Sequence, residues 1–204
     1  MKVVKLVIFL LIAYIPSAIG AITPAQILEK TSGSISKAKG ISSVFVIKNQ
    51  GKSYKGNFKA KGNKFSFISS FSSIWYDGKN MWVYNPMSKE TTLTCPDKAE
   101  VAETNPLSYI SGYRKYYVAS FSNRKVKGQY VVKLTPKKSS SGMPPVEISI
   151  NQSTYKPVEF RISPKGMGIT TVSFSSLNYN ANISDTELKY PEKSYKNVEV
   201  VDMR

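Results

Sequence analysis

The chain has 204 residues, with 29 Lys and Arg against 13 Asp and Glu (formal net charge +16), one cysteine and no histidine. The lack of histidine excludes Ser-His-Asp and Cys-His catalytic arrangements, HExxH zinc sites and Cys/His metal clusters. The single cysteine, Cys95, excludes an internal disulfide. We therefore expect a non-enzymatic protein without catalytic residues, metal or cofactor, although acids distant in sequence could still meet as a carboxylate pair.

Residues 1–20 have the layout of a secretory signal peptide. Lys2 and Lys5 precede an apolar run, Leu6–Ile15, which is shorter than the roughly 20 residues that span a bilayer. We expect cleavage after Gly20 to leave residues 21–204 as one exported, monomeric domain; an uncleaved anchor is the alternative. Cys95 lies far from this cleavage site, so no lipobox cysteine is available to receive a lipid.

The first element of the mature chain is predicted to be a helix that begins at Thr23 and ends by Gly40. Thr23 suits an N-cap, Pro24 suits the first turn, and Gln26 completes a capping box. One face carries the residues Ile27, Leu28, Thr31 and Ile35. Since Gly33 and several serines weaken the helix, it should need an apolar surface to pack against.

From Ile41 onward the pattern changes to short segments of period two, separated by turn residues, which is typical of antiparallel β structure. The interval Cys95–Gly112 interrupts this pattern and should carry short helical turns. A Ser/Pro/Gly loop is expected at Lys137–Pro145, and the tail beyond Asp185 has little periodicity. The predicted strands lie near residues 42–48, 53–60, 64–70, 73–76, 81–84, 90–94, 116–121, 130–135, 146–150, 158–163 and 169–177.

So many strands with so few helices predict a closed or partly closed barrel, which can enclose a ligand cavity. Aromatic residues are concentrated between Phe65 and Tyr84: Phe65 and Phe67 share one strand face, and Trp82 and Tyr84 share another. These faces could line an apolar pocket, or they could form an ordinary solid core.

The positive charge indicates an anionic partner, and export favours lipid headgroups or an acidic protein over nucleic acid. Basic stretches with aromatics occur at Lys52–Lys59, Tyr113–Tyr117 and Arg124–Lys127. Such stretches can bind single-stranded nucleic acid, but a half-buried strand with lysines on its exposed face gives the same pattern. We expect no nucleic-acid partner.

Residues Trp75–Pro86 read WYDGKNMWVYNP, a strand, a DGK turn, and a strand that ends in aromatic-x-Tyr-Asn-Pro. This segment resembles the periplasmic lipoprotein carriers of the LolA type. A helix directly after the signal, the strand Lys64–Phe67 and the segment Thr104–Leu107 follow the order found in that family. The resemblance implies a mainly β fold: an unclosed antiparallel β-barrel of about eleven strands with a short α-helical lid over an apolar cavity.

The resemblance also implies a role in the periplasm. Such carriers accept lipoproteins from an ATP-driven extraction complex of the inner membrane, shield the acyl chains, and deliver the cargo to an outer-membrane acceptor. On this resemblance the expected cavity residues are Phe65, Phe67, Ile74, Trp82, Tyr84 and Leu93, and the expected lid residues are Ile27, Leu28, Leu107, Tyr109 and Ile110.

The family has an arginine that interacts with the lid, and the nearest residue here is Lys61. Because lysine lacks the planar fork of arginine, Lys61 predicts a lid that opens more easily or is held by other residues. Ordinary helix-to-core packing explains Leu107, Tyr109 and Ile110 equally well. Two other functions stay open: a related exported module that binds lipid or glycolipid or senses lipoproteins, and a non-binding adhesion or scaffold domain.

Overall fold

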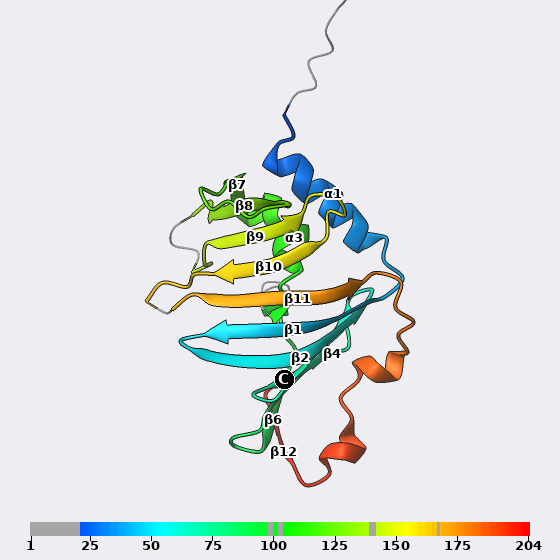
Figure 1. Ribbon diagram of the computed structural model, residues 1–204. Coiled ribbons are helices and arrows are strands. Elements are labelled where there is room, and N and C mark those ends of the chain that lie inside the picture. Colours follow the sequence, from blue (N-terminus) through cyan, green and yellow to red (C-terminus); the bar gives the residue numbers. More distant parts are fainter. Residues whose placement is uncertain (1–20, 98–99, 102–103, 139–141, 167) are drawn as a thin grey trace, which may run out of the picture.

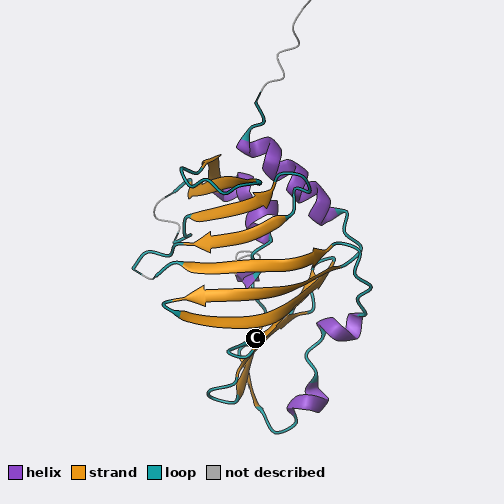
Figure 2. Cartoon of the chain, in the orientation of Figure 1, coloured by secondary structure: helices purple, strands orange, loops and turns teal. Residues whose placement is uncertain are grey.

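The computed structural model describes residues 21–97, 100–101, 104–138, 142–166 and 168–204; the predicted signal peptide, 1–20, lies outside them. The described chain is mainly β, as predicted (Figure 2). Eleven of its strands match the predicted segments to within one or two residues. These are β1 (Ile41–Asn49), β2 (Lys52–Lys61), β3 (Lys64–Ser69), β4 (Ser73–Tyr76), β5 (Met81–Asn85), β6 (Glu90–Thr94), β7 (Tyr117–Phe121), β8 (Gln129–Pro136), β9 (Val146–Asn151), β10 (Pro157–Ile162) and β11 (Thr170–Asn178).

The strands form one sheet in the order β12-β6-β5-β4-β3-β2-β1-β11-β10-β9-β8-β7. Its two halves are joined by the antiparallel pairing of β1 with β11, and strands β7 and β12 form its edges. The sheet curves around the helical segment without closing on itself (Figure 1). The expectation of an unclosed barrel is therefore confirmed.

The tail contains structure that the sequence did not predict. Two short 3-10 helices, η2 (Asp185–Leu188) and η3 (Glu192–Tyr195), lead to a twelfth strand, β12 (Glu199–Asp202), which pairs with β6 in parallel. The sheet is thus not purely antiparallel. All four residues of β12 are exposed, so the strand lacks the alternation of buried and exposed residues that marks a strand in sequence.

Helix α1 (Pro24–Ser36) begins as predicted: Thr23 Oγ1 accepts a hydrogen bond from the Gln26 amide at 3.2 Å, and the capping box is complete. The helix ends before the predicted limit at Gly40, because Lys37 caps it and Gly33 and the serines near its end favour helix poorly. Ile27, Leu28 and Thr31 form its buried face. The helix packs against β7 and against α3, introduced below.

In the described part of the predicted interruption, Cys95–Gly112, lies the four-residue helix α3 (Ser108–Ser111). A second helix of four residues, α4 (Tyr113–Tyr116), follows directly after the predicted limit at Gly112. They lie behind the curved sheet in Figure 1, on its concave side. We call residues 104–116 the lid segment. None of the helices in the described ranges has the length and apolarity to cross a bilayer.

The first half of the sheet is held by a cluster of aromatic rings on its concave face. The rings of Phe45 and Phe67 stack at 3.7 Å between centroids, and Phe58 meets Phe67 edge-on at 6.3 Å. Gly56 makes this possible: a Cβ there would lie 2.3 Å from the Phe45 ring and 2.2 Å from the Ile68 carbonyl oxygen. Only glycine at position 56 lets the Phe45 ring and strand β3 approach β2 this closely.

Replacing Gly56 with alanine should destabilise the fold by about 2–3 kcal/mol, because the added methyl group forces the Phe45 ring and strand β3 to shift. The control is Gly33→Ala on α1, where a Cβ would meet nothing within 4 Å and helix propensity should add up to about 1 kcal/mol. Urea denaturation of the two variants gives both values. A Gly56→Ala protein as stable as wild type would refute this packing.

Candidate functional site

The strand register assigns the predicted cavity residues to two different faces of the sheet. Phe67 lies directly opposite Phe58 and Ile74, and Phe65 lies opposite Tyr76. Since directly opposed residues share a face, Phe65, Phe67 and Ile74 all point to the concave side. There they belong to the main buried cluster or pack against it.

Trp82, Tyr84 and Leu93 lie on the other face. Trp82 is opposite Leu93 and Trp75, and Trp75 is opposite Ser66, which points away from its neighbours Phe65 and Phe67. The expectation that all six residues line one interior is therefore wrong. The error arises because β4 and β5 were predicted without their register, and one residue of shift exchanges the two faces.

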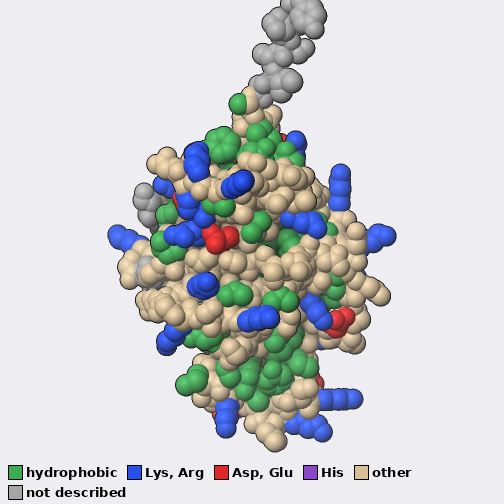
Figure 3. Space-filling model, in the orientation of Figure 1, with side chains coloured by type: hydrophobic (Ala, Val, Ile, Leu, Met, Phe, Trp, Pro, Cys, Tyr) green, Lys and Arg blue, Asp and Glu red, His purple; other side chains and the backbone are tan. Residues whose placement is uncertain are grey.

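The tail covers this outer aromatic face. Tyr190 stacks on Trp82 at 6.0 Å between ring centroids, and Tyr195 meets Tyr84 edge-on at 4.7 Å. Figure 3 shows apolar side chains gathered in its lower part, where the tail and β6 lie. The tyrosines of the tail, Tyr190 and Tyr195, are the signal in the sequence that could have indicated this cover.

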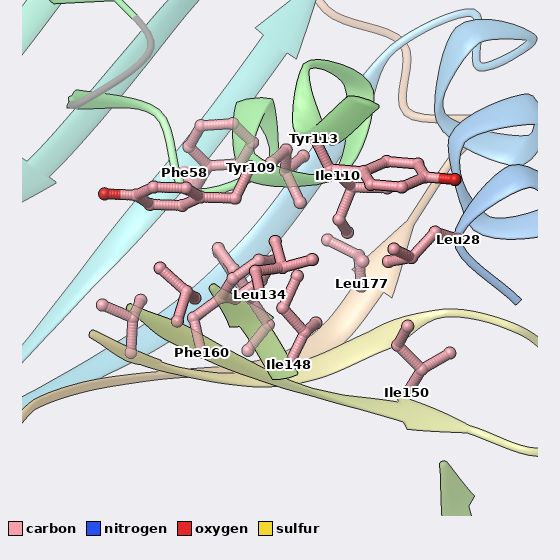
Figure 4. Packing of buried hydrophobic residues seen from close by; sticks show 14 of the residues in the cluster. Leu28, Phe58, Tyr109, Ile110, Tyr113, Leu134, Ile148, Ile150, Phe160 and Leu177 are labelled. Atoms are coloured by element: carbon pink, nitrogen blue, oxygen red, sulfur yellow. The ribbon is translucent and has the colours of Figure 1, made fainter. Parts of the chain in front are cut away.

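The predicted lid residues fill the concave side. Ile110 is fully buried and Leu107 is 3% exposed; with Tyr109 they join the same cluster as Phe58, Phe65 and Phe67. Ile27 and Leu28 of α1, both fully buried, belong to it too. In Figure 4, Ile110 points from the lid segment toward the strands that carry Leu134 and Ile148. The space enclosed by the curved sheet is thus occupied by side chains of the protein itself.

One pocket reaches this interior between the lid segment and α1. It has a volume of about 270 Å³ and is open to solvent on one side. Its apolar wall comes from Ile35, Ala38, Ile41, Ala60 and Leu107. Hydroxyl groups, Asn105, Gly62 and Lys61 complete the lining; the serines are Ser32, Ser36, Ser108 and Ser111.

Apolar burial dominates the attachment of the lid segment. Helices of four residues have no stability of their own. The Glu29–Arg114 ion pair links α4 to α1, but both side chains are exposed, and such pairs contribute little. Within the segment, Asn105 Oδ1 accepts a hydrogen bond from the Leu107 amide at 3.0 Å. At its end, the Tyr116 carbonyl accepts a hydrogen bond from the Lys137 amide at 2.8 Å. The rest of the segment stays in place because Leu107, Tyr109 and Ile110 are removed from water.

Lys61 lines the pocket, but its ammonium group is held by the tail. Lys61 Nζ donates to the Ile183 carbonyl and to the Asp185 carboxylate, both at 3.2 Å. Asp185 also binds Lys64 Nζ at 2.9 Å, and Glu187 binds Lys59. The predicted latch residue Lys61 thus helps to fix the tail to β2, while Lys64 fixes it to β3; the role of Lys61 toward the lid stays a prediction.

The sequence left open a pair of carboxylates distant from one another along the chain. On the outer face of β9 and β10, Glu147 and Glu159 share one cation, Arg124. Arg124 lies 3.3 Å from Glu147 and 3.1 Å from Glu159, so both acids are ion-paired with a cation. Among the described residues no group of three or more His, Cys, Asp and Glu could hold a metal ion. The apolar interior with its pocket is therefore the candidate site.

The fold and the pocket define a class of protein: an unclosed β-barrel whose apolar interior is covered by helices. The chain belongs to the family described as outer membrane lipoprotein carrier protein LolA, which matches residues 17–165. The resemblance drawn from Trp75–Pro86 is thereby confirmed. A search of curated proteins gives no match.

Two solved structures with this fold are distant from this chain in sequence. An uncharacterized conserved protein from Thermus thermophilus has a TM-score of 0.58 and 12% identity, covering 87% of this chain and 97% of that one. MucB has a TM-score of 0.50 and 12% identity, covering 82% of this chain and 62% of the MucB chain. At this level of sequence identity, the two structural similarities show a shared fold and do not show a shared function.

The attachment of the tail should weaken in acid. Lys59 holds the pKa of Glu187 at about 2, below its ordinary value of 4.5. A carboxylate with a lowered pKa stabilises the fold above its ordinary pKa, and this contribution is lost as pH falls through the folded value. Wild type should therefore resist proteolysis of the tail better than Glu187→Gln above pH 4.5, and the two should become equal near pH 2. A difference that does not change over this range would contradict the assignment.

Proposed function

We propose that the protein is an exported carrier that binds the acyl chains of lipoproteins released from the inner membrane and delivers them to an outer-membrane acceptor. The observation that carries this proposal is the interior of an unclosed sheet, filled by the lid side chains Leu107, Tyr109 and Ile110 beside an open pocket. Family membership supports the same class of cargo. The protein works by binding and release, with no bond made or broken.

The pocket of about 270 Å³ is smaller than a typical ligand site of about 300–1,000 Å³, so an acyl chain must displace the lid. A buried methylene is worth roughly 0.8 kcal/mol, which gives on the order of 10 kcal/mol for one long chain. Exposing a buried Leu or Ile costs about 1.5–3 kcal/mol each. The lid therefore offsets much of the gain, and the net affinity stays low enough for release.

Export, loading and release of the cargo can be assigned to parts of the chain. Residues 1–20 act as the signal peptide, and residues 21–204 form one monomeric domain in the periplasm. An ATP-driven complex of the inner membrane loads the carrier at the pocket, and an outer-membrane acceptor unloads it. Once the lid lifts, Phe65, Phe67 and Ile74 contact the acyl chain, and Ile27 and Leu28 form the wall on the side of α1.

Two substitutions on the same helix test the pocket. Ser32 lines it, whereas Ser34, two residues on, lines a separate surface hollow on the other side of α1. Ser32→Trp should fill the pocket and Ser34→Trp should not. Membranes that carry radiolabelled lipoprotein and the extraction complex are incubated with each protein, and the soluble one-to-one complex is measured. Wild type and Ser34→Trp should yield it, and Ser32→Trp should yield at least about tenfold less.

Failure of wild type to yield a soluble complex would refute the carrier proposal. Equal yields from both tryptophan variants would refute the pocket as the loading site. Wild type that retains a phospholipid or glycolipid but no lipoprotein would instead favour the related lipid-binding module. Wild type that retains no lipid would favour a scaffold domain.

Shortening a lid residue should weaken the fold and strengthen binding at the same time. Ile110→Ala removes apolar burial that competes with the acyl chain, so stability should fall by about 2–4 kcal/mol and affinity for a fluorescent fatty acid should rise about tenfold. Leu188→Ala is the control, because Leu188 is equally buried but lies outside the interior cluster. It should lose similar stability without any gain in affinity. A loss of affinity in Ile110→Ala would contradict competition by the lid.

A further inference from the structure

The ends of the strands opposite the pocket form a second surface, which we call the distal rim. Because the strands are antiparallel, the β2–β3 turn at Gly62 lies at the pocket end, and the turns β1–β2, β3–β4, β5–β6 and β10–β11 lie at the other. Three of these four distal turns expose a large apolar side chain. Phe71 is 40% exposed, Met87 is 89% exposed and Ile169 is 47% exposed.

Hydrogen bonds within the turns fix the segments that carry Phe71 and Met87. Ser69 Oγ donates to the Ser72 carbonyl at 2.8 Å across the turn that carries Phe71, and the Phe71 ring rests on Tyr54 at 4.7 Å. Asn85 Oδ1 accepts from the Met87 amide at 2.9 Å. The rim therefore holds these side chains toward water, although burying them would stabilise the fold.

Exposed lysines lie near the turns that carry Phe71, Met87 and Ile169, which we call the apolar tips of the rim. Lys52 and Lys48 lie on the β1–β2 hairpin, Lys89 follows Met87, and Lys165 lies on the β10–β11 connection. Lys48, Lys52, Arg161 and Ile169 line one shallow hollow of about 600 Å³ between the β1–β2 hairpin and the β10–β11 connection. Glu90 and Glu199 begin β6 and β12 at this end. Blue side chains project at the left of Figure 3, the side on which the β1–β2 hairpin lies in Figure 1.

We propose that the distal rim docks on the surface of an anionic lipid bilayer. Apolar side chains at separate tips can each enter the interface, and the lysines between them meet the negative headgroups. A bilayer accepts such separate apolar tips, because each one enters the interface independently of the others. The rim and the pocket lie at opposite ends of the strands, so a docked molecule keeps its pocket uncovered. This inference does not rest on the proposed carrier function.

Sedimentation with vesicles tests the proposal, using phosphatidylcholine with and without about 30% phosphatidylglycerol at low salt. Wild type should bind only the anionic vesicles, and high salt should weaken the binding. The rim variant Lys48→Glu/Lys52→Glu/Lys165→Glu should bind at least about a hundredfold more weakly, because the loss of each lysine near the surface weakens binding about fivefold and three are lost. The control Lys37→Glu/Lys39→Glu/Lys79→Glu changes the net charge equally at the pocket end and should lose less than about tenfold.

A third variant, Met87→Ser with Phe71→Ser and Ile169→Ser, should bind at least about tenfold more weakly, because the apolar insertion is lost. Circular dichroism should be unchanged in all three variants, which excludes misfolding. Fatty-acid binding should also be unchanged, which shows that the loss of vesicle binding does not come from damage to the pocket. If the serine variant misfolds, Met87→Ser alone replaces it. Equal losses in the rim and control variants, or binding of wild type to an acidic protein but not to anionic vesicles, would overturn the proposal.

Discussion

The structure depends on how the concave face of an unclosed sheet is kept from water. Twelve strands that do not close leave an apolar interior that must be covered, and the lid segment with its two four-residue helices covers it together with α1. Burial of Leu107 and Ile110 therefore stabilises the fold and blocks the interior at once. Any ligand that enters must replace these side chains, so stability and affinity are linked through the same residues.

Both faces of the first half of the sheet are covered, but in different ways. The concave side meets the lid and α1 through aliphatic and aromatic packing. The outer side meets the tail, where Tyr190 and Tyr195 pack on Trp82 and Tyr84 and ion pairs with Lys59 and Lys64 add polar attachment. The lid borders an open pocket and has an exposed ion pair, Glu29–Arg114, whereas several ion pairs hold the tail in addition to its packing. This difference favours the lid as the part that moves.

The sequence predicted those features that local chemistry determines. The capping box at Thr23 set the start of α1, and turn residues set the limits of eleven strands to within one or two residues. It did not predict which face carries Trp82, because register depends on pairing between strands. Nor did it predict that Lys61 would bind Asp185, which is distant in sequence, or that exposed Glu199–Asp202 would form a strand.

Hydrogen exchange of the lid amides tests the central claim most directly. The amides of residues 104–116 are compared in the protein alone and in complex with a diacylated lipopeptide, with strands β1 and β11 as the internal reference. The account predicts that the lid amides lose protection on binding while the two central strands keep theirs. Unchanged or increased protection of the lid in a fully loaded complex would show that the acyl chains do not replace its side chains.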